Sequence, residues 1–421
     1  MLVNHGVPLA YPYPVGMSIR AFSYVAFFTI YVHPPALERL WYHRYTMVTR
    51  RSFLSMSGCA CLATMAPAQA QDQAPVLVRD PDREFPPQEA RWYKKLPGKR
   101  VECELCPNRC RVADRERGTC GVRENRDGTY VTLIHSRVCS VHIDPIEKKP
   151  LFHFLPGTSA LSLATPGCNM WCKFCQNWQI SQFRPEQIDC IHATPETLAL
   201  SARKSGAPTL AYTYTEPVVG AEYVFDAASA GKHHGLRSVM ISNGYIEKDP
   251  LKELLAVLDG VKIDLKAFSQ KFYEEITGGK LEDILKTILA IKSSRTWLEL
   301  VVLIIPTLND SKEEIQQMAR WIMKNLGPDT PVHFTRFHPT YRMKNLPSTP
   351  IATLEQCKSV ADREGLNFVY IGNVPGHPGE HTFCPKCKKP VIRRYGFTIL
   401  SQSIRNGACA HCGKTLPGVW S

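Results

Sequence analysis

Three closely spaced cysteines are the residues of this chain best suited to redox chemistry. Cys168, Cys172 and Cys175 lie in the run Ala164-Thr-Pro-Gly-Cys-Asn-Met-Trp-Cys-Lys-Phe-Cys-Gln-Asn-Trp178. A [4Fe-4S] cluster normally takes four thiolates. Three thiolates on one short loop would therefore leave the fourth iron to bind an exchangeable ligand. The alternatives are a zinc knuckle that lacks one ligand and buried free thiols.

Eight further cysteines form two groups with metal-ligand spacing, one on each side of this loop. They are Cys103, Cys106, Cys110 and Cys120, and then Cys384, Cys387, Cys409 and Cys412. The first group suits a small metal-nucleated module, with zinc as the first interpretation and a second [4Fe-4S] cluster as the alternative. The second group is two C-x2-C pairs 21 residues apart, which predicts a zinc ribbon, with free thiols as the alternative. His411 lies inside the last pair and is expected to face solvent, because four sulfurs already complete a tetrahedron.

The composition is that of a globular enzyme rather than of a nucleic-acid-binding protein. The chain has 421 residues, enough for two to three domains, and is 44% hydrophobic. Its net charge of +13 includes +4 from residues 1–70, and bound metal sites with their thiolates would lower the remainder further. No run of Lys and Arg interleaved with aromatic residues occurs. We therefore expect no nucleic-acid partner.

The first seventy residues carry the features of an export signal. Thr49-Arg-Arg-Ser-Phe-Leu54 matches the twin-arginine motif, and Ala68-Gln-Ala70 is typical of a cleavage site. Since a signal peptide begins at an N-terminus, we expect residues 47–70 to be the signal and residues 1–46 to be an upstream translation. The protein is then periplasmic; a coincidental arginine pair in a cytoplasmic protein is the alternative. The apolar stretch 21–32 is too short to span a bilayer.

The remaining chain divides into four parts. Residues 71–100 are rich in Pro, Gln and charge and predict a linker, 101–150 a four-cysteine module, 151–378 the core and 379–421 the ribbon module. In the core, apolar strands alternate with helical patterns. We expect strands at 160–166, 208–214, 237–242, 261–266, 297–305, 331–336 and 367–372, and helices at 221–234, 251–258, 281–293, 312–326 and 354–364. This alternation predicts an α/β fold with parallel strands, a partial or full (β/α) barrel of the TIM type, with small cysteine-rich metal modules at both ends.

Together these features resemble the radical SAM enzymes of the AmmeMemoRadiSam group, relatives of the pyruvate formate-lyase activating enzymes. The resemblance runs from about residue 101 to the C-terminus. It covers the three cysteine groups, Gly121–Asn125, Asp144–Pro150, Tyr212–Pro217, Ser242–Tyr245, Asp264–Lys266 and Gly372–Gly376. It implies that the loop cysteines bind a [4Fe-4S] cluster whose open iron takes S-adenosylmethionine, and Phe174 is the aromatic expected before the last of them.

Several of these residues are expected at the carboxyl ends of the strands, where the mouth of a barrel lies. The resemblance implies that Glu216 accepts a hydrogen bond from the ammonium group of S-adenosylmethionine and that Lys266, beside Asp264, neutralises its carboxylate. Ser242 and Asn243 end the next strand beside the ligand. The alternatives are a helix N-terminal carboxylate for Glu216, a plain turn at Ser242–Gly244 and a surface ion pair for Asp264 and Lys266.

The reaction that the resemblance implies is reductive cleavage of S-adenosylmethionine. An electron donor reduces the cluster, the S–C5′ bond breaks, and the 5′-deoxyadenosyl radical abstracts a hydrogen atom from a substrate. We expect a radical SAM enzyme whose substrate the sequence does not identify, with a protein or peptide as the candidate. The narrower hypothesis is an activase that installs a glycyl radical on a partner enzyme, and the third is a non-catalytic zinc-binding interaction protein.

Overall fold

The structure is a computed structural model, and it describes residue 77 and residues 84–421. The predicted upstream segment, the twin-arginine motif with its cleavage site and part of the predicted linker lie outside the described residues. No helix within the described part combines the length and the apolar character that crossing a membrane requires.

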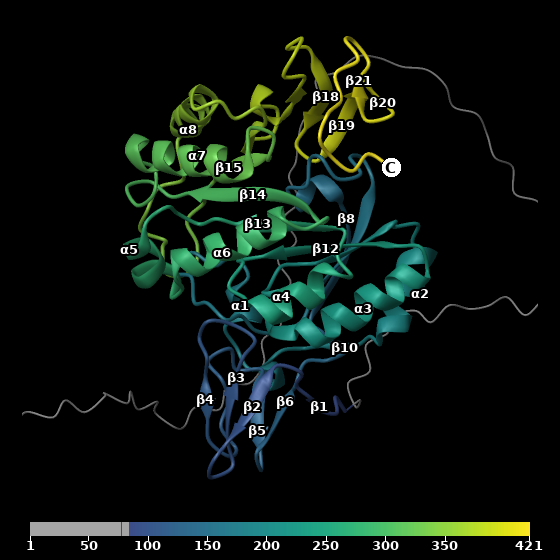
Figure 1. Cartoon of the computed structure of the whole chain (residues 1–421), viewed down its shortest axis with the longest axis vertical. Helices are drawn as coiled ribbons and strands as arrows, with labels where there is room; N and C mark the ends of the chain where they lie inside the picture. Colours follow the sequence, from purple (N-terminus) through teal and green to yellow (C-terminus); the bar gives the residue numbers. More distant parts are fainter. Residues whose placement is uncertain (1–76, 78–83) are drawn as a thin grey trace, which may run out of the picture. The chain divides into compact units, whose positions relative to one another are not determined.

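The core is built on one eight-stranded sheet (Figure 1). Seven strands are parallel: β9 (Ser159–Ala164), β11 (Thr209–Tyr212), β12 (Arg237–Ser242), β13 (Gly260–Asp264), β14 (Trp297–Ile304), β15 (Val332–Arg336) and β16 (Val369–Gly372). The eighth, β8 (Ser140–Pro145), pairs antiparallel with β9. Within the described residues the strand order runs from β16 to β8 without closing, so the predicted barrel is a partial one.

Helices follow the parallel strands and cover the sheet (Figure 1). They are α2 (Pro195–Lys204), α3 (Ala221–His233), α4 (Lys248–Leu255), α6 (Leu281–Lys292), α7 (Lys312–Leu326) and α8 (Ile351–Arg363). The short α1 (Trp178–Ser181) precedes α2, and the short α5 (Gln270–Phe272) lies between α4 and α6. In α7, Ser311 caps the first turn by accepting a hydrogen bond from the Glu314 amide, 3.2 Å away. Ile315, Ala319 and Ile322 recur at helical spacing and are buried. Apolar periodicity therefore fixes which face of each helix meets the sheet.

The predicted strands and helices of the core are confirmed with shifts of a few residues. The largest shifts are three residues, in α4, which begins at Lys248 rather than at residue 251, and in α8, which begins at Ile351 rather than at residue 354. Strand β8 and helix α2 have no counterpart among the predicted elements. In β8, Val141 is half-buried while His142 and Ile143 are exposed, because β8 is an edge strand with one covered face. The sequence therefore lacks the continuous apolar run by which the buried strands were predicted.

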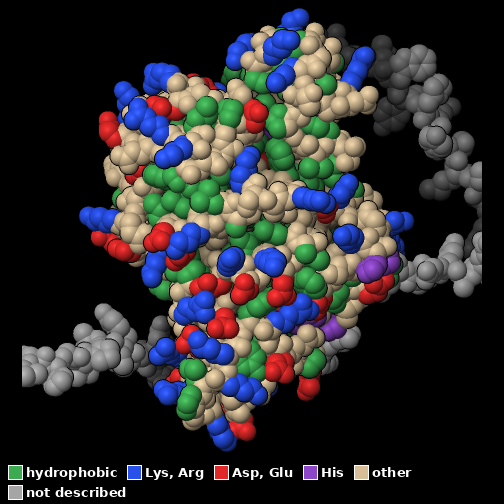
Figure 2. All heavy atoms as spheres, in the orientation of Figure 1, with side chains coloured by type: hydrophobic (Ala, Val, Ile, Leu, Met, Phe, Trp, Pro, Cys, Tyr) green, Lys and Arg blue, Asp and Glu red, His purple; other side chains and the backbone are tan. Residues whose placement is uncertain are grey.

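Small antiparallel sheets form the N-terminal module. The strands are β1 (Gln88–Glu89), β2 (Tyr93–Leu96), β3 (Arg100–Cys103), β4 (Arg111–Val112), β5 (Arg123–Arg126) and β6 (Thr129–Thr132), while β7 (Arg137–Val138) pairs with β10 (Ile191–His192). Strands β1 and β2 lie inside the predicted linker, and β8 of the main sheet lies inside the predicted module. Side chains of both charge signs are interspersed over the module (Figure 2).

The C-terminal module packs against Phe152, in the segment between β8 and β9, and against Phe368 and Tyr370 at β16. Its strands are β17 (Thr382–Phe383), β18 (Pro390–Tyr395), β19 (Thr398–Gln402), β20 (Ile404–Arg405) and β21 (Ala408–Cys409). The backbones of His153 and Leu155 exchange 2.7 Å hydrogen bonds with Val419. Arg394 is fully buried and donates a 2.9 Å hydrogen bond to the Phe152 carbonyl. The module is thus bonded through buried backbone groups to the segment that joins β8 to β9.

A buried polar network joins this segment to β14 and β15. Glu299 accepts hydrogen bonds from the Phe152 amide at 3.0 Å, the His153 amide at 2.8 Å and His333 at 2.8 Å. His153 Nδ1 lies 2.7 Å from the Pro417 carbonyl oxygen, which can only accept, so this nitrogen carries the hydrogen. Its Nε2 then accepts from the Tyr370 hydroxyl at 2.6 Å. The network requires a neutral His153 ring.

We expect this histidine to make the fold sensitive to acid. Burial lowers the pKa of His153 to about 4, against the opposing charge of Glu299, whereas an unfolded histidine titrates near 6.5. The unfolded chain therefore binds the proton more tightly, so the stabilisation is complete above about pH 6.5 and is lost as the pH falls towards 4. Between pH 7 and pH 5 the loss is about 2 kcal/mol. Urea unfolding of the wild type and His153→Gln should show a shallower pH dependence in the variant; equal slopes would contradict the assignment.

Candidate functional site

The loop with the three cysteines begins where β9 ends. Gly167 donates its backbone N–H to the Ile180 carbonyl at 3.0 Å, and Asn177 Nδ2 donates to the Tyr214 carbonyl at 2.7 Å. Trp171 and Lys173 donate to carbonyls of η4 (Tyr273–Thr277), each at 3.0 Å. These bonds to the segments after β11 and after β13 hold the loop across the carboxyl ends of the strands.

Gly167 brings the N-terminal module into contact with this loop. Its φ is +99°, and a Cβ there would lie 2.5 Å from Val122 Cγ1 and 3.2 Å from the Cys120 carbonyl oxygen. Asn108 Nδ2 also donates to the Asn169 carbonyl at 2.9 Å. The module therefore packs directly on the cysteine loop.

Replacing Gly167 by alanine should destabilise this contact strongly. The variant combines an unfavourable φ with a clash against backbone and Val122, and we expect a loss of about 3 kcal/mol in the free energy of unfolding. Gly206 is the matched control: its φ is +71°, but a Cβ added there would meet nothing within 4 Å. Urea unfolding of Gly167→Ala and Gly206→Ala should show a clearly larger loss for the first, and equal losses would contradict the close packing.

The donor set of the loop fits an iron-sulfur cluster. The Cys168 sulfur accepts hydrogen bonds from the Met170 amide at 3.4 Å and Asn243 Nδ2 at 3.9 Å. Burial raises the pKa of Cys172 to about 11, opposed by the charge of Lys266. Among the described residues, the three sulfurs of residues 168, 172 and 175 do not all come within 4.8 Å of one another. A single tetrahedral ion needs closer sulfurs, whereas a cluster distributes its thiolates over separate irons.

Glu216, shortly after β11, is hydrogen-bonded to residues at the end of β12. Its carboxylate is buried and accepts hydrogen bonds from the Val218 amide at 3.0 Å, Ser242 Oγ at 2.7 Å and the Asn243 amide at 2.8 Å. Burial raises the pKa of Glu216, and these donors oppose the rise. The structure shows the capping role given above as the alternative, because the carboxylate caps η3 (Pro217–Gly220). Two oxygens offer about four acceptor positions, so one remains for a ligand.

Asp264 lies between two lysines at the end of β13. It pairs with Lys262 and, at 3.5 Å, with Lys266. Burial opposes ionisation, but the two lysines lower the pKa of the carboxyl. Lys266 Nζ lies 5.5 Å from the ring centroid of Phe174, so this lysine faces the cysteine loop. Lys262 was not among the predicted site residues. Its position could have indicated it, because residues 262, 264 and 266 lie two apart along an extended chain and so share one face.

Asp144, from the motif Asp144–Pro150, lies in a separate buried cluster. It pairs with Lys148 at 2.9 Å and Lys149 at 2.5 Å, and it accepts a hydrogen bond from Tyr214. Burial lowers the pKa of Lys149 to about 8 against the attraction of Asp144. Tyr214 has a φ of +66° and its carbonyl holds Asn177. This cluster fixes the backbone that anchors the end of the cysteine loop.

A hollow of about 660 Å³ opens beside Cys168. The N-terminal module supplies one wall with residues 115–121 and Glu124, and the cysteine loop and residues 181–184 supply the other. Trp171 and Phe183 line it and are exposed. Arg117 in its wall is held by Glu124 at 2.8 Å and by Glu186 at 2.7 Å. The hollow thus combines exposed aromatic rings with fixed charges.

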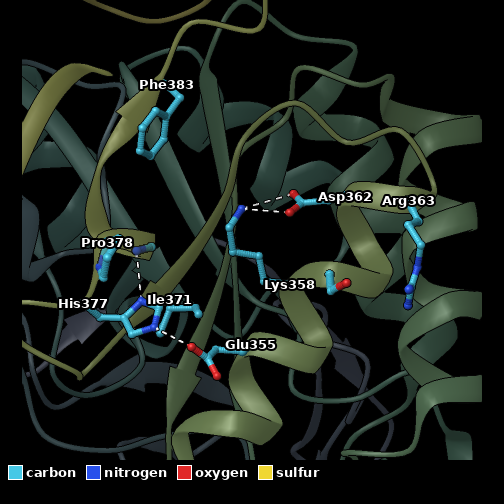
Figure 3. A pocket seen from close by; sticks show the side chains of 10 residues that line it. Glu355, Lys358, Asp362, Arg363, Ile371, His377, Pro378 and Phe383 are labelled. Atoms are coloured by element: carbon cyan, nitrogen blue, oxygen red, sulfur yellow. Dashed lines mark hydrogen bonds and ion pairs between the residues drawn. The ribbon is translucent and has the colours of Figure 1, made fainter. Parts of the chain in front are cut away.

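A second hollow of about 490 Å³ lies between α8 and the segment after β16 (Figure 3). Its charged side chains pair with one another, Lys358 with Asp362 at 3.1 Å and His377 with Glu355 at 3.2 Å (Figure 3). It contains none of the predicted site residues. His338, in the loop after β15, lies 3.2 Å from Ser348 Oγ and is exposed.

Comparison with known proteins agrees with this geometry. The family model of the Radical SAM superfamily matches residues 162–322. The uncharacterized protein MJ0808 of Methanocaldococcus jannaschii is 43% identical over 330 residues, which are 78% of this chain and 98% of that protein. The chain belongs to the radical SAM superfamily.

This radical SAM enzyme is also homologous, at low identity, to activating enzymes. The pyruvate formate-lyase 1-activating enzyme of Escherichia coli is 23% identical over 222 residues, 48% of this chain and 89% of that protein. The pyruvate formate-lyase-activating enzyme of Clostridium pasteurianum is 28% identical over 181 residues, 41% of this chain and 72% of that protein. The superfamily implies a [4Fe-4S] cluster and S-adenosylmethionine as cofactors, with an electron donor.

Proposed function

We propose that this radical SAM enzyme abstracts hydrogen from an extended segment of a protein or peptide. The hollow beside Cys168 carries the proposal. Its volume of about 660 Å³ is larger than a single amino-acid side chain. The exposed Trp171 and Phe183 offer apolar contacts, and the charged groups of its wall offer polar contacts to a peptide backbone. The names of the homologous activating enzymes state that they act on another enzyme, which supports a macromolecular substrate.

We further propose the division of roles among the site residues. Cys168, Cys172 and Cys175 hold the cluster, and Asn243 donates a hydrogen bond to the first of these sulfurs. The remaining acceptor position of Glu216 takes the ammonium group of S-adenosylmethionine, and Lys266 takes its carboxylate, with Asp264 holding the lysine in place. The cluster and S-adenosylmethionine together supply a 5′-deoxyadenosyl radical. The buried strand ends exclude water around it.

Deuterium transfer tests the substrate class. Protein and small-molecule fractions would be prepared from the native host grown in heavy water and given to the anaerobically reconstituted enzyme with dithionite and S-adenosylmethionine. We expect 5′-deoxyadenosine to gain one mass unit with the protein fraction. Gain of deuterium only from the small-molecule fraction would refute the peptide substrate while leaving the radical chemistry intact. A glycyl-radical signal in a partner protein would select the activase.

We propose that the C-terminal module is a zinc ribbon. Cys384 Sγ lies 3.6 Å from Cys412 Sγ, and Cys387 Sγ lies 3.8 Å from Cys409 Sγ. All four sulfurs lie within 4.8 Å of one another. Tetrahedral zinc with bonds near 2.3 Å requires sulfurs about 3.8 Å apart, so the geometry supports zinc.

Loss of this zinc should destabilise the enzyme, because the ribbon is bonded to the segment between β8 and β9. We expect Cys409→Ser to lose one zinc per chain and to lower the melting temperature by roughly 10 °C. His411→Ala is the matched control, since this residue is exposed as predicted. Zinc analysis and thermal unfolding measure the effect. Full zinc content in Cys409→Ser would exclude the site.

We also propose export by the twin-arginine pathway. The motif Thr49–Leu54 and the cleavage site ending at Ala70 support it, and this pathway suits a protein that folds around its cofactors first. A tagged chain begun at Met47 should be cleaved and reach the periplasm of a host with a working pathway. An uncleaved cytoplasmic product would refute export.

A further inference from the structure

The four cysteines of the N-terminal module surround one small interior region. Cys103 ends β3, Cys110 directly precedes β4, Cys106 lies between them and Cys120 lies before β5. The Cys103 amide donates to the Cys110 carbonyl at 2.9 Å, which closes this turn. Cys103 and Cys106 are buried, and all four thiols interact electrostatically with one another. The arrangement is that of a ligand set.

The spacing of these sulfurs differs from that in the zinc ribbon. Across residue 77 and residues 84–421, three or more sulfur ligands lie within 4.8 Å of one another only in the C-terminal group. No three sulfurs of the group at residues 103–120 therefore lie all within 4.8 Å of one another, whereas the ligands of one tetrahedral ion lie about 3.8 Å apart. The same holds for the sulfurs of Cys168, Cys172 and Cys175. Thiolates that bind separate irons of one cluster have such a separation.

A buried hydroxyl without a partner lies among the same sulfurs. Tyr130 is 0% exposed, and its hydroxyl has no hydrogen-bond partner in the described structure. A Cβ added at Gly118 would lie 2.6 Å from this hydroxyl and 3.6 Å from Cys110 Sγ, so the hydroxyl and this sulfur flank the same backbone position. A buried hydroxyl donor left unpaired is costly, so a bound acceptor is needed there.

We propose that Cys103, Cys106, Cys110 and Cys120 bind a second [4Fe-4S] cluster and that Tyr130 donates a hydrogen bond to one of its sulfurs. With all four irons ligated by protein, this cluster has no open corner for S-adenosylmethionine. It lies beside the first site, because Asn108 bonds to the Asn169 carbonyl and Cys120 lines the same hollow as Cys168. The buried Arg123, bonded to Glu222 at 3.0 Å, offsets the negative charge of the thiolates.

Iron analysis of the full-length chain separates the two sites. A triple variant, Cys168→Ala, Cys172→Ala and Cys175→Ala, removes the ligands of the first site. After anaerobic reconstitution we expect about eight irons and eight sulfides per wild-type chain and about four of each in the triple variant. No iron and two zincs per chain in the triple variant would overturn the proposal, whatever the fate of the first cluster.

Further variants in the same background assign the ligands. Adding Cys106→Ala and Cys120→Ala should remove the remaining iron, whereas adding Cys139→Ala, outside all three groups, should leave about four irons. Iron retained without Cys106 and Cys120 would overturn the assignment. If the five-fold variant fails to fold, Tyr130→Phe still tests it. That variant should keep its iron and shift the electron paramagnetic resonance signal of the reduced cluster, and an unchanged signal would refute the hydrogen bond.

Discussion

Cys168→Ala is expected to abolish cleavage of S-adenosylmethionine. The Cys168 sulfur accepts hydrogen bonds from the Met170 amide and the Asn243 side chain, close to the end of β9. Two thiolates on the loop hold a cluster poorly, so formation of 5′-deoxyadenosine with dithionite should fall at least about 1,000-fold, or about 4 kcal/mol in the activation barrier. Chromatographic assay of 5′-deoxyadenosine measures it.

Cys357→Ala is the matched control for this experiment. Cys357 is also a buried thiol, but it lies on α8, outside the three cysteine groups. We expect its iron content and product formation to stay within about two-fold of wild type, since so distant a change leaves the loop intact. Product formation by Cys168→Ala at the wild-type rate would refute the proposed role of the loop.

Asp264→Asn should also impair the reaction severely. The substitution leaves Lys262 and Lys266 close together without their shared counter-charge. Lys262 is buried and Asp264 is half-buried, and removing one partner of such a hydrogen-bonded charge pair costs about 3 kcal/mol. We therefore expect kcat/KM for S-adenosylmethionine to fall about 100-fold, mainly through KM, because the lysine that meets the carboxylate is displaced.

Asp259→Asn provides a comparison at the other end of the same strand. Asp259 pairs with Arg237 at 2.9 Å and accepts a hydrogen bond from the Ser238 amide at 2.8 Å, just before β13 begins. This variant should lose stability but keep its kcat/KM. Equal kinetic losses in the two variants would indicate a general effect on β13 rather than a role at its carboxyl end.

The positions of the candidate site residues could be predicted largely from the sequence because they depend on local features of the chain. The spacing of Cys168, Cys172 and Cys175 sets a loop, and the apolar runs before Glu216 and Asp264 place these residues at strand ends. The contact between Asn243 and Cys168 could not be predicted in the same way. It joins residues 75 positions apart through the packing of β12 beside the loop.

In the N-terminal module, too, some features could be predicted from the sequence and others depend on contacts between distant segments. Its cysteine spacing indicated a metal site, but the choice between zinc and a cluster depends on the distances between sulfurs and on Tyr130, which β6 brings beside them. Strands β1 and β2 lie before residue 101, and β8 of the main sheet lies before residue 151. Strands β2 and β8 are hydrogen-bonded to neighbouring strands but contain both polar and apolar residues. Backbone pairing by itself produces no periodic pattern of apolar residues in the sequence.

By itself, the sequence determined the three cysteine groups, the alternation of strands and helices, and the residues at the strand ends. These features depend on short spacings and on the periods of helix and strand, which one stretch of chain contains in full. Only the tertiary structure decided that the sheet stays open, that Glu216 caps η3 while joining two strands, and that the N-terminal module shares a hollow with the cysteine loop. Those features arise from contacts between distant segments, whose geometry depends on how the whole core packs.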